Sequence, residues 1–153
     1  MQWYLEDKER LELEIELMED KGVNFQLFQD EEGNLLWRGS LSIMGHYHSD
    51  VRLVYPENFP YEPIKVYILN PMLPTSNLHI HEDGSICYMR EEEWSPDWTA
   101  YAVYLKTIEF LYEFYSGKMD YSLPLPMTDE TYSPRTERRE KSILERLMEV
   151  FLW

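Results

Sequence analysis

The chain of 153 residues contains one cysteine, Cys87, and no long apolar run. A single cysteine excludes an intrachain disulfide, as is usual for proteins of the reducing cytoplasm. No apolar segment approaches the roughly 20 residues that span a bilayer, and the charged segment 1–10 lacks the apolar stretch of a secretory signal. We therefore expect a cytoplasmic protein that does not cross a membrane.

Positive charge is also scarce, because 14 basic residues stand against 29 acidic ones and give a net charge of -15. This charge repels the phosphates of nucleic acids and of anionic lipids. We therefore expect neither nucleic acid nor a membrane as a partner. The alternative is that the net negative charge only keeps the protein soluble and indicates nothing about its partners.

Apolar residues make up 44% of the chain and aromatic residues 15%, which argues against disorder. A chain of this length forms one core that buries roughly two thirds of its unfolded surface, but is too short for two ordinary domains. We predict one domain over residues 1–153.

Local patterns predict a helix followed by an antiparallel meander. The segment 5–21 alternates apolar residues with Glu at period two, which is typical of a strand, but its Leu and Glu content favours the helix that we predict. Short apolar runs separated by turn signals then predict three strands, and a proline-rich crossing leads to a fourth. The predicted strands are 23–28, 35–43, 48–55 and 65–69.

The segment 70–97 has no sustained periodicity and contains Cys87. An irregular stretch of this length inside a compact domain is usually functional. An accessible loop thiol can act as a nucleophile and carry an acyl group as a thioester. The alternative is a buried cysteine that packs as a small apolar side chain.

Two helices are predicted after this stretch. Thr99 is a good N-cap for the first, and Gly117 is suited to end it. A second helix is expected after Pro134, because proline favours the first helical position. It runs to an apolar end at Trp153, which either packs on the body of the domain or presents an anchor to a partner, and we expect it to dock a partner.

Three motifs follow one another along the chain. The segment 59–66 reads Phe-Pro-Tyr-Glu-Pro-Ile-Lys-Val, 84–88 reads Gly-Ser-Ile-Cys-Tyr, and 94–96 reads Trp-Ser-Pro, with Thr99 three residues later. In this order and spacing they resemble the ubiquitin-conjugating enzymes. That family has Tyr-Pro-Phe-Lys-Pro-Pro-Lys-Val, Gly-x-Ile-Cys-Leu and Trp-Ser-Pro-x-x-Thr at these places.

The resemblance implies an α+β ubiquitin-conjugating fold: a four-stranded antiparallel meander with an N-terminal helix, an active-site flap and C-terminal helices. It also implies a function, in which Cys87 takes a ubiquitin-like modifier from an activating enzyme as a thioester and passes it to an amine of a target protein. No cofactor is implied. The alternatives are a non-catalytic binding module of the same fold and, less well supported, a thiol hydrolase, for which no Asp or Asn is obviously placed to orient a histidine base.

The chain departs from the family at the His-Pro-Asn motif that precedes the cysteine. Counted back from Cys87, the family histidine falls on Asn77 and the family asparagine, which holds the oxyanion, falls on His79. His79 is a candidate oxyanion donor, a candidate base, or a brace for the flap. A histidine at this place resembles bacterial relatives encoded in antiphage operons.

The resemblance further implies an acidic residue beyond the helix that follows the active site, which orients or deprotonates the acceptor lysine. Asp120 is the only candidate in the segment 117–125. The alternative is an ordinary solvated loop aspartate.

A zinc site is the competing interpretation of the histidines. His46 and His48, and likewise His79 and His81, are separated by one residue, which places each pair on one face of a strand. No acidic partner stands at a suitable spacing. We therefore expect no metal.

Overall fold

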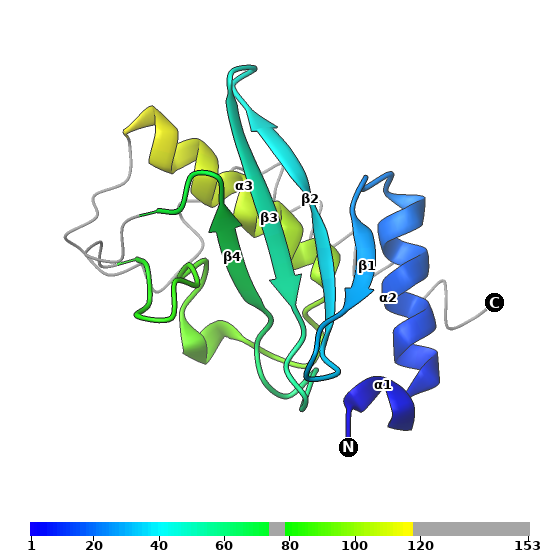
Figure 1. Ribbon diagram of the computed structural model, residues 1–153. Coiled ribbons are helices and arrows are strands. Elements are labelled where there is room, and N and C mark those ends of the chain that lie inside the picture. The colour runs from blue at the N-terminus through cyan, green and yellow to red at the C-terminus, as the bar shows by residue number, and fades with distance from the viewer. Residues whose placement is uncertain (74–78, 118–153) are drawn as a thin grey trace.

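The computed structural model describes residues 1–73 and 79–117, which form an α+β fold of one sheet and flanking helices (Figure 1). In chain order the elements are α1 (Trp3–Glu6), α2 (Lys8–Asp20), β1 (Gln26–Gln29), β2 (Leu35–Ile43), β3 (Tyr47–Val54), β4 (Lys65–Leu69), the 3-10 helix η1 (Glu91–Glu93) and α3 (Ala100–Ser116). The strands form one antiparallel sheet in the order β1-β2-β3-β4. The α+β class and the four-stranded meander are confirmed.

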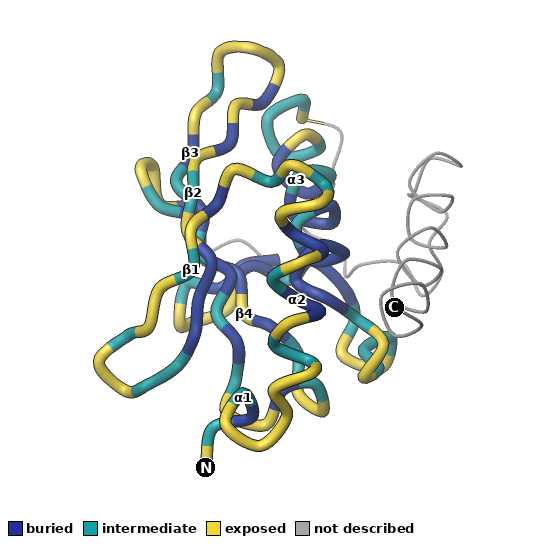
Figure 2. Tube along the Cα trace, turned by 90° about the vertical axis from the view of Figure 1, so that its right-hand side faces the viewer, coloured by how far each residue is buried: buried dark blue, intermediate teal, exposed yellow. Residues whose placement is uncertain are grey.

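Helices α2 and α3 cover the same side of the sheet and leave the other side open (Figure 2). α3 packs on β2 and β3 and also contacts α2. The predicted ends of α3 are confirmed, since the Thr99 hydroxyl accepts from the N–H of Ala102 at 3.1 Å and Gly117 takes a left-handed φ of 70°. Apolar residues of both layers form one core between them.

The helical interpretation of the first segment is confirmed, but the helix is interrupted at Asp7. The Asp7 carboxylate accepts from the N–H of Arg10 at 3.0 Å and begins α2. The short helix α1 before it buries Trp3, whose ring packs on Tyr55 and Phe59 with centroids 4.9 and 4.8 Å apart. The period-two pattern therefore reflects no strand.

The first strand begins three residues later than predicted, at Gln26. Phe25 is buried, and its ring lies so close to Gly39 of β2 that a Cβ at Gly39 would lie 2.2 Å from it. Phe25 therefore packs in the core, although the apolar run 23–28 predicted that it would lie in the first strand. The region 70–97 also contains the short helix η1, which was not predicted.

The carboxylate of Glu14 is buried between α2, the end of β3 and the start of α3. Its Oε1 accepts from the Tyr55 hydroxyl at 2.9 Å and from the N–H of Ala100 at 2.8 Å, and the indole of Trp37 donates to Tyr55 at 2.8 Å. Burial raises the pKa of Glu14, and the guanidinium of Arg10, 3.4 Å from Oε2, opposes this rise. One acidic group thus joins both helices to the sheet.

In residues 1–73 and 79–117, no helix is long and apolar enough to cross a bilayer. The helix predicted after Pro134, with its docking role at Trp153, lies outside the described residues.

We predict that Glu14→Ala lowers the free energy of unfolding by about 3–5 kcal/mol, the usual effect of removing one partner from a buried ion pair. The change leaves the Tyr55 hydroxyl and the Ala100 N–H without their acceptor. Glu14→Gln keeps an oxygen at that place and should cost less. Urea denaturation measures both.

Glu12→Ala is the matched control, because Glu12 is exposed on the same helix. The pKa of Glu14 is raised on folding, so its contribution to stability is present at low pH and is lost as the pH rises through that raised value. With rising pH, the free energy of unfolding of the wild type should therefore fall relative to that of Glu14→Gln, which does not titrate. Equal losses for Glu14→Ala and Glu12→Ala would contradict the buried network.

Candidate active site

Cys87 lies on a short antiparallel hairpin formed by residues 79–81 and 85–87. The N–H of Cys87 donates to the carbonyl of His79 at 2.7 Å, and the N–H of His81 donates to the carbonyl of Ser85 at 2.8 Å. Gly84 makes the turn at a φ of 89°, a conformation that glycine adopts without strain. The Gly-x-Ile-Cys pattern therefore folds as a turn followed by a paired arm.

The turn of this hairpin is fixed by Asp83. Its Oδ1 accepts from the N–H and the hydroxyl of Ser85 at 2.9 and 2.6 Å, and its Oδ2 lies 2.8 Å from Nζ of Lys65 at the start of β4. These contacts hold the pKa of Asp83 well below its usual range. The N–H of Ile86 also donates to the carbonyl of Val66 at 2.9 Å, so the cysteine arm is attached to the edge of the sheet.

The segment after Cys87 is attached to the proline-rich crossing that precedes β4. The Tyr88 hydroxyl donates to the carbonyl of Ile64, and the indole of Trp94 donates to the carbonyl of Pro60 at 2.8 Å. Arg10 of α2 donates to the carbonyls of Pro96 and Trp98 at 2.9 and 2.8 Å. The motifs at 59–66, 84–88 and 94–96 thus meet in space.

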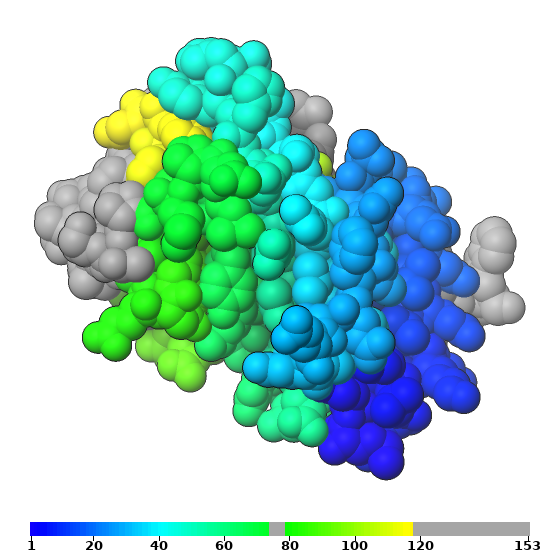
Figure 3. Space-filling model, viewed as in Figure 1, coloured from blue at the N-terminus to red at the C-terminus, as the bar shows by residue number. Residues whose placement is uncertain are grey.

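These segments line a groove of about 640 Å³, and Cys87 is one of its lining residues. The green segment that follows β4 lies at the surface in the space-filling view (Figure 3). Carboxylates of Glu62, Asp83 and Glu91 line the groove together with Lys65 and His81. The other lining residues are mostly apolar or backbone neighbours of Cys87: Pro56, Pro63, Ile64, Ser85, Ile86, Tyr88, Met89 and Trp94.

The thiol of Cys87 is half-buried, and its Sγ lies 3.5 Å from the carbonyl of Met89. Burial raises the pKa of this thiol, Arg90 opposes the rise and Glu93 adds to it. A hydrogen bond to a carbonyl needs the protonated form and favours it further. At neutral pH the site therefore holds a thiol, not a preformed thiolate.

Comparison of the chain with protein-family models and with curated protein sequences found no match.

The structure brings two of the candidate catalytic residues together and leaves two outside its described part. His79 stands directly opposite Cys87 in the hairpin, and the residue is 2% exposed. Asn77 and Asp120 lie outside the described residues.

His81 is the site residue that the sequence interpretation missed, since we treated it only as a possible zinc ligand. It is exposed and lines the groove, whereas His79 is buried. The signal was present in the spacing, because residues two apart in a strand share a face. Within 1–73 and 79–117, no group of three or more His, Cys, Asp or Glu could hold a metal ion.

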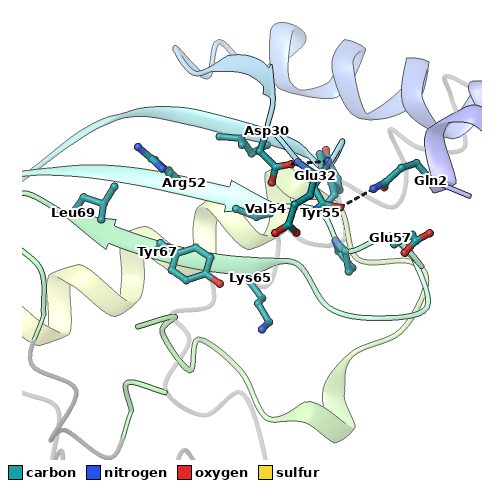
Figure 4. A pocket seen from close by; sticks show the side chains of 13 residues that line it. Gln2, Asp30, Glu32, Arg52, Val54, Tyr55, Glu57, Lys65, Tyr67 and Leu69 are labelled. Atoms are coloured by element: carbon teal, nitrogen blue, oxygen red, sulfur yellow. Dashed lines mark hydrogen bonds between the residues drawn. The ribbon is translucent and has the colours of Figure 1, made fainter. Parts of the chain in front are cut away.

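A second hollow, of about 770 Å³, lies on the open face of the sheet (Figure 4). Arg52 and Val54 of β3 and Lys65 and Tyr67 of β4 line one side of it. Its other side is formed by the β1–β2 turn, where Asn34 accepts from the Gln2 amide at 2.8 Å. This hollow is larger than the Cys87 groove but contains no thiol, so we place the candidate chemistry at Cys87.

We predict that alkylation of Cys87 by iodoacetamide rises with pH through a midpoint above 9.0, the ordinary thiol pKa, because burial disfavours the thiolate. Arg90→Gln should raise this midpoint and Glu93→Gln should lower it. The pH dependence of the alkylation rate measures each shift. Arg38→Gln, on the exposed surface of β2, is the control that should leave it unchanged, and a midpoint near 7 in the wild type would refute the buried thiol.

Proposed function

We propose that this protein has the ubiquitin-conjugating fold and carries a ubiquitin-like modifier as a thioester on Cys87. The observation that supports the proposal most directly is the meeting of the three motif segments around one half-buried thiol. An activating enzyme would supply the modifier, and the amine of a protein target would receive it.

The environment of the thiol suits an acyl carrier. A carrier must accept an acyl group yet protect the stored bond from water. The raised pKa of Cys87 agrees with this need, because a thiol that is a weaker acid is a poorer leaving group, which slows hydrolysis of its thioester. The half-buried position also limits the access of water to the stored bond.

The alternative is a non-catalytic module of the same fold that binds partners. The observation that favours it is the burial of His79, which occupies the place of the asparagine in the family motif. Under that alternative Cys87 is only a packing residue. Acyl transfer to and from Cys87 distinguishes the two functions.

We predict that Cys87 accepts the C-terminus of ubiquitin, or of a ubiquitin-like protein, from a mercaptoethanesulfonate thioester, which replaces the activating enzyme. A thiol exchanges with a thioester by direct attack on the carbonyl. The adduct should disappear under reducing thiol and should be absent in Cys87→Ala. Non-reducing gel electrophoresis and intact mass measurement detect it.

A double variant, Cys87→Ala/Ser42→Cys, controls for the reactivity of any thiol, because Ser42 is exposed on β2. It should form the adduct but pass the modifier to lysine more slowly than the wild type. Equal transfer by both thiols, or an adduct of unchanged yield in Cys87→Ala, would refute the carrier function.

We predict that His79→Ala slows discharge of the loaded protein to lysine by about 100-fold if the imidazole stabilises the oxyanion. His79→Asn, which restores the family residue, should retain part of the activity. Single-turnover discharge of a preformed thioester measures both, and circular dichroism checks that the fold is kept. Wild-type rates in both variants would leave His79 with the role of a flap brace.

A further inference from the structure

His81 lines the groove and has no role in the proposed function as stated above. His81 is exposed and lines the same groove as Cys87. Its backbone position is fixed on both sides, since its N–H donates to Ser85 at 2.8 Å and its carbonyl accepts from Gly84 at 2.9 Å. The ring therefore extends from a defined point beside the thiol.

The pairing of the hairpin sets the separation of the two residues. Ile80 pairs with Ile86, so His81 stands opposite Ser85 and diagonally across from Cys87. Diagonal neighbours of an antiparallel pair lie on the same face, roughly 7–8 Å apart, within reach of aromatic side chains. This separation leaves room for an amine between the imidazole and an acyl group on sulfur.

The surrounding charges favour the arrival of a cationic amine. Glu62 on the crossing, Asp83 on the turn and Glu91 on η1 line the groove. Lys65 is the opposing cation, and it is paired with Asp83 at 2.8 Å. Glu82 precedes the turn, and Arg90 and Glu93 act on the thiol from the segment after it. The excess of carboxylates attracts an ammonium group, but an ammonium group cannot attack a carbonyl until it loses a proton.

We propose that His81 accepts the proton of the amine that attacks the Cys87 thioester. This inference rests on the proposed function. The amine nitrogen forms a bond with the carbonyl carbon, the carbon–sulfur bond breaks, and the proton released by nitrogen passes to the imidazole. The leaving thiolate then takes a proton back from the imidazolium, which yields an amide and a neutral thiol and leaves His81 as it began.

The environment of Cys87 suits the last of these steps. Burial of the sulfur raises the pKa of the thiol, so the thiolate leaving group readily recovers a proton. Imidazole is the side chain that most readily gains and loses protons near neutral pH. His79 is less suited to this role, because it is buried and an amine arrives from solvent.

The test compares two nucleophiles on protein loaded with ubiquitin from its mercaptoethanesulfonate thioester. Free lysine must lose a proton to react, whereas hydroxylamine is already neutral near pH 7 and needs little help from a base. His81→Gln should slow discharge to lysine by about 100-fold and leave discharge to hydroxylamine unchanged.

His48→Gln is the matched control, because His48 is an exposed histidine on β3. It should discharge both nucleophiles at the wild-type rate. Equal slowing of lysine and hydroxylamine in His81→Gln would show that His81 only positions the thioester, and an unchanged lysine rate would show that His81 has no role in the transfer. Either result overturns the inference while normal loading leaves the carrier function intact, whereas failure of wild-type Cys87 to load would overturn the carrier function itself.

Discussion

The buried carboxylate of Glu14 is the interaction on which the arrangement of this protein depends. It accepts from Tyr55 at the end of β3 and from the first N–H of α3, while Arg10 beside it reaches the carbonyls of Pro96 and Trp98. A buried charge is costly unless hydrogen bonds compensate it, so the three elements must keep their relative positions. The segment after the candidate site is therefore positioned by Arg10 of a helix that lies far earlier in the chain, 86 residues before Pro96 and 88 before Trp98.

The candidate site lies between this network and the edge of the sheet. The arm that carries Cys87 is attached to β4 through Ile86, and the next segment is attached to the proline-rich crossing through Trp94. Both hydrogen bonds are accepted by main-chain carbonyls, so they do not depend on the identity of the side chain at the accepting residue. Such a frame can hold a half-buried thiol in place while the groove around it stays open to a second reactant.

The sequence predicts much of this frame, because its signals are local. Thr99 caps α3, Gly117 ends it, and β2 and β4 have the predicted bounds. The two errors have different causes. Asp7 divides the first helix because its carboxylate caps α2 through the N–H of Arg10, a local signal that the helical pattern of the segment outweighs in the sequence. Phe25 leaves the strand pattern where Gly39 provides space for its ring, and no local pattern contains that fact, since the partner lies elsewhere in the chain.

The same limit explains the two histidines of the site. Counting back from Cys87 places His79 at the position of a family asparagine, and it does stand opposite the cysteine. Spacing alone, however, gives His79 and His81 the same face and cannot say which ring meets solvent. Packing leaves His79 2% exposed and opens His81, next to the turn, to the groove. When the amine attacks, the sulfur of Cys87 is acylated and cannot act as a base, so we assign the removal of the amine proton to the accessible imidazole of His81, two residues beyond the aligned position.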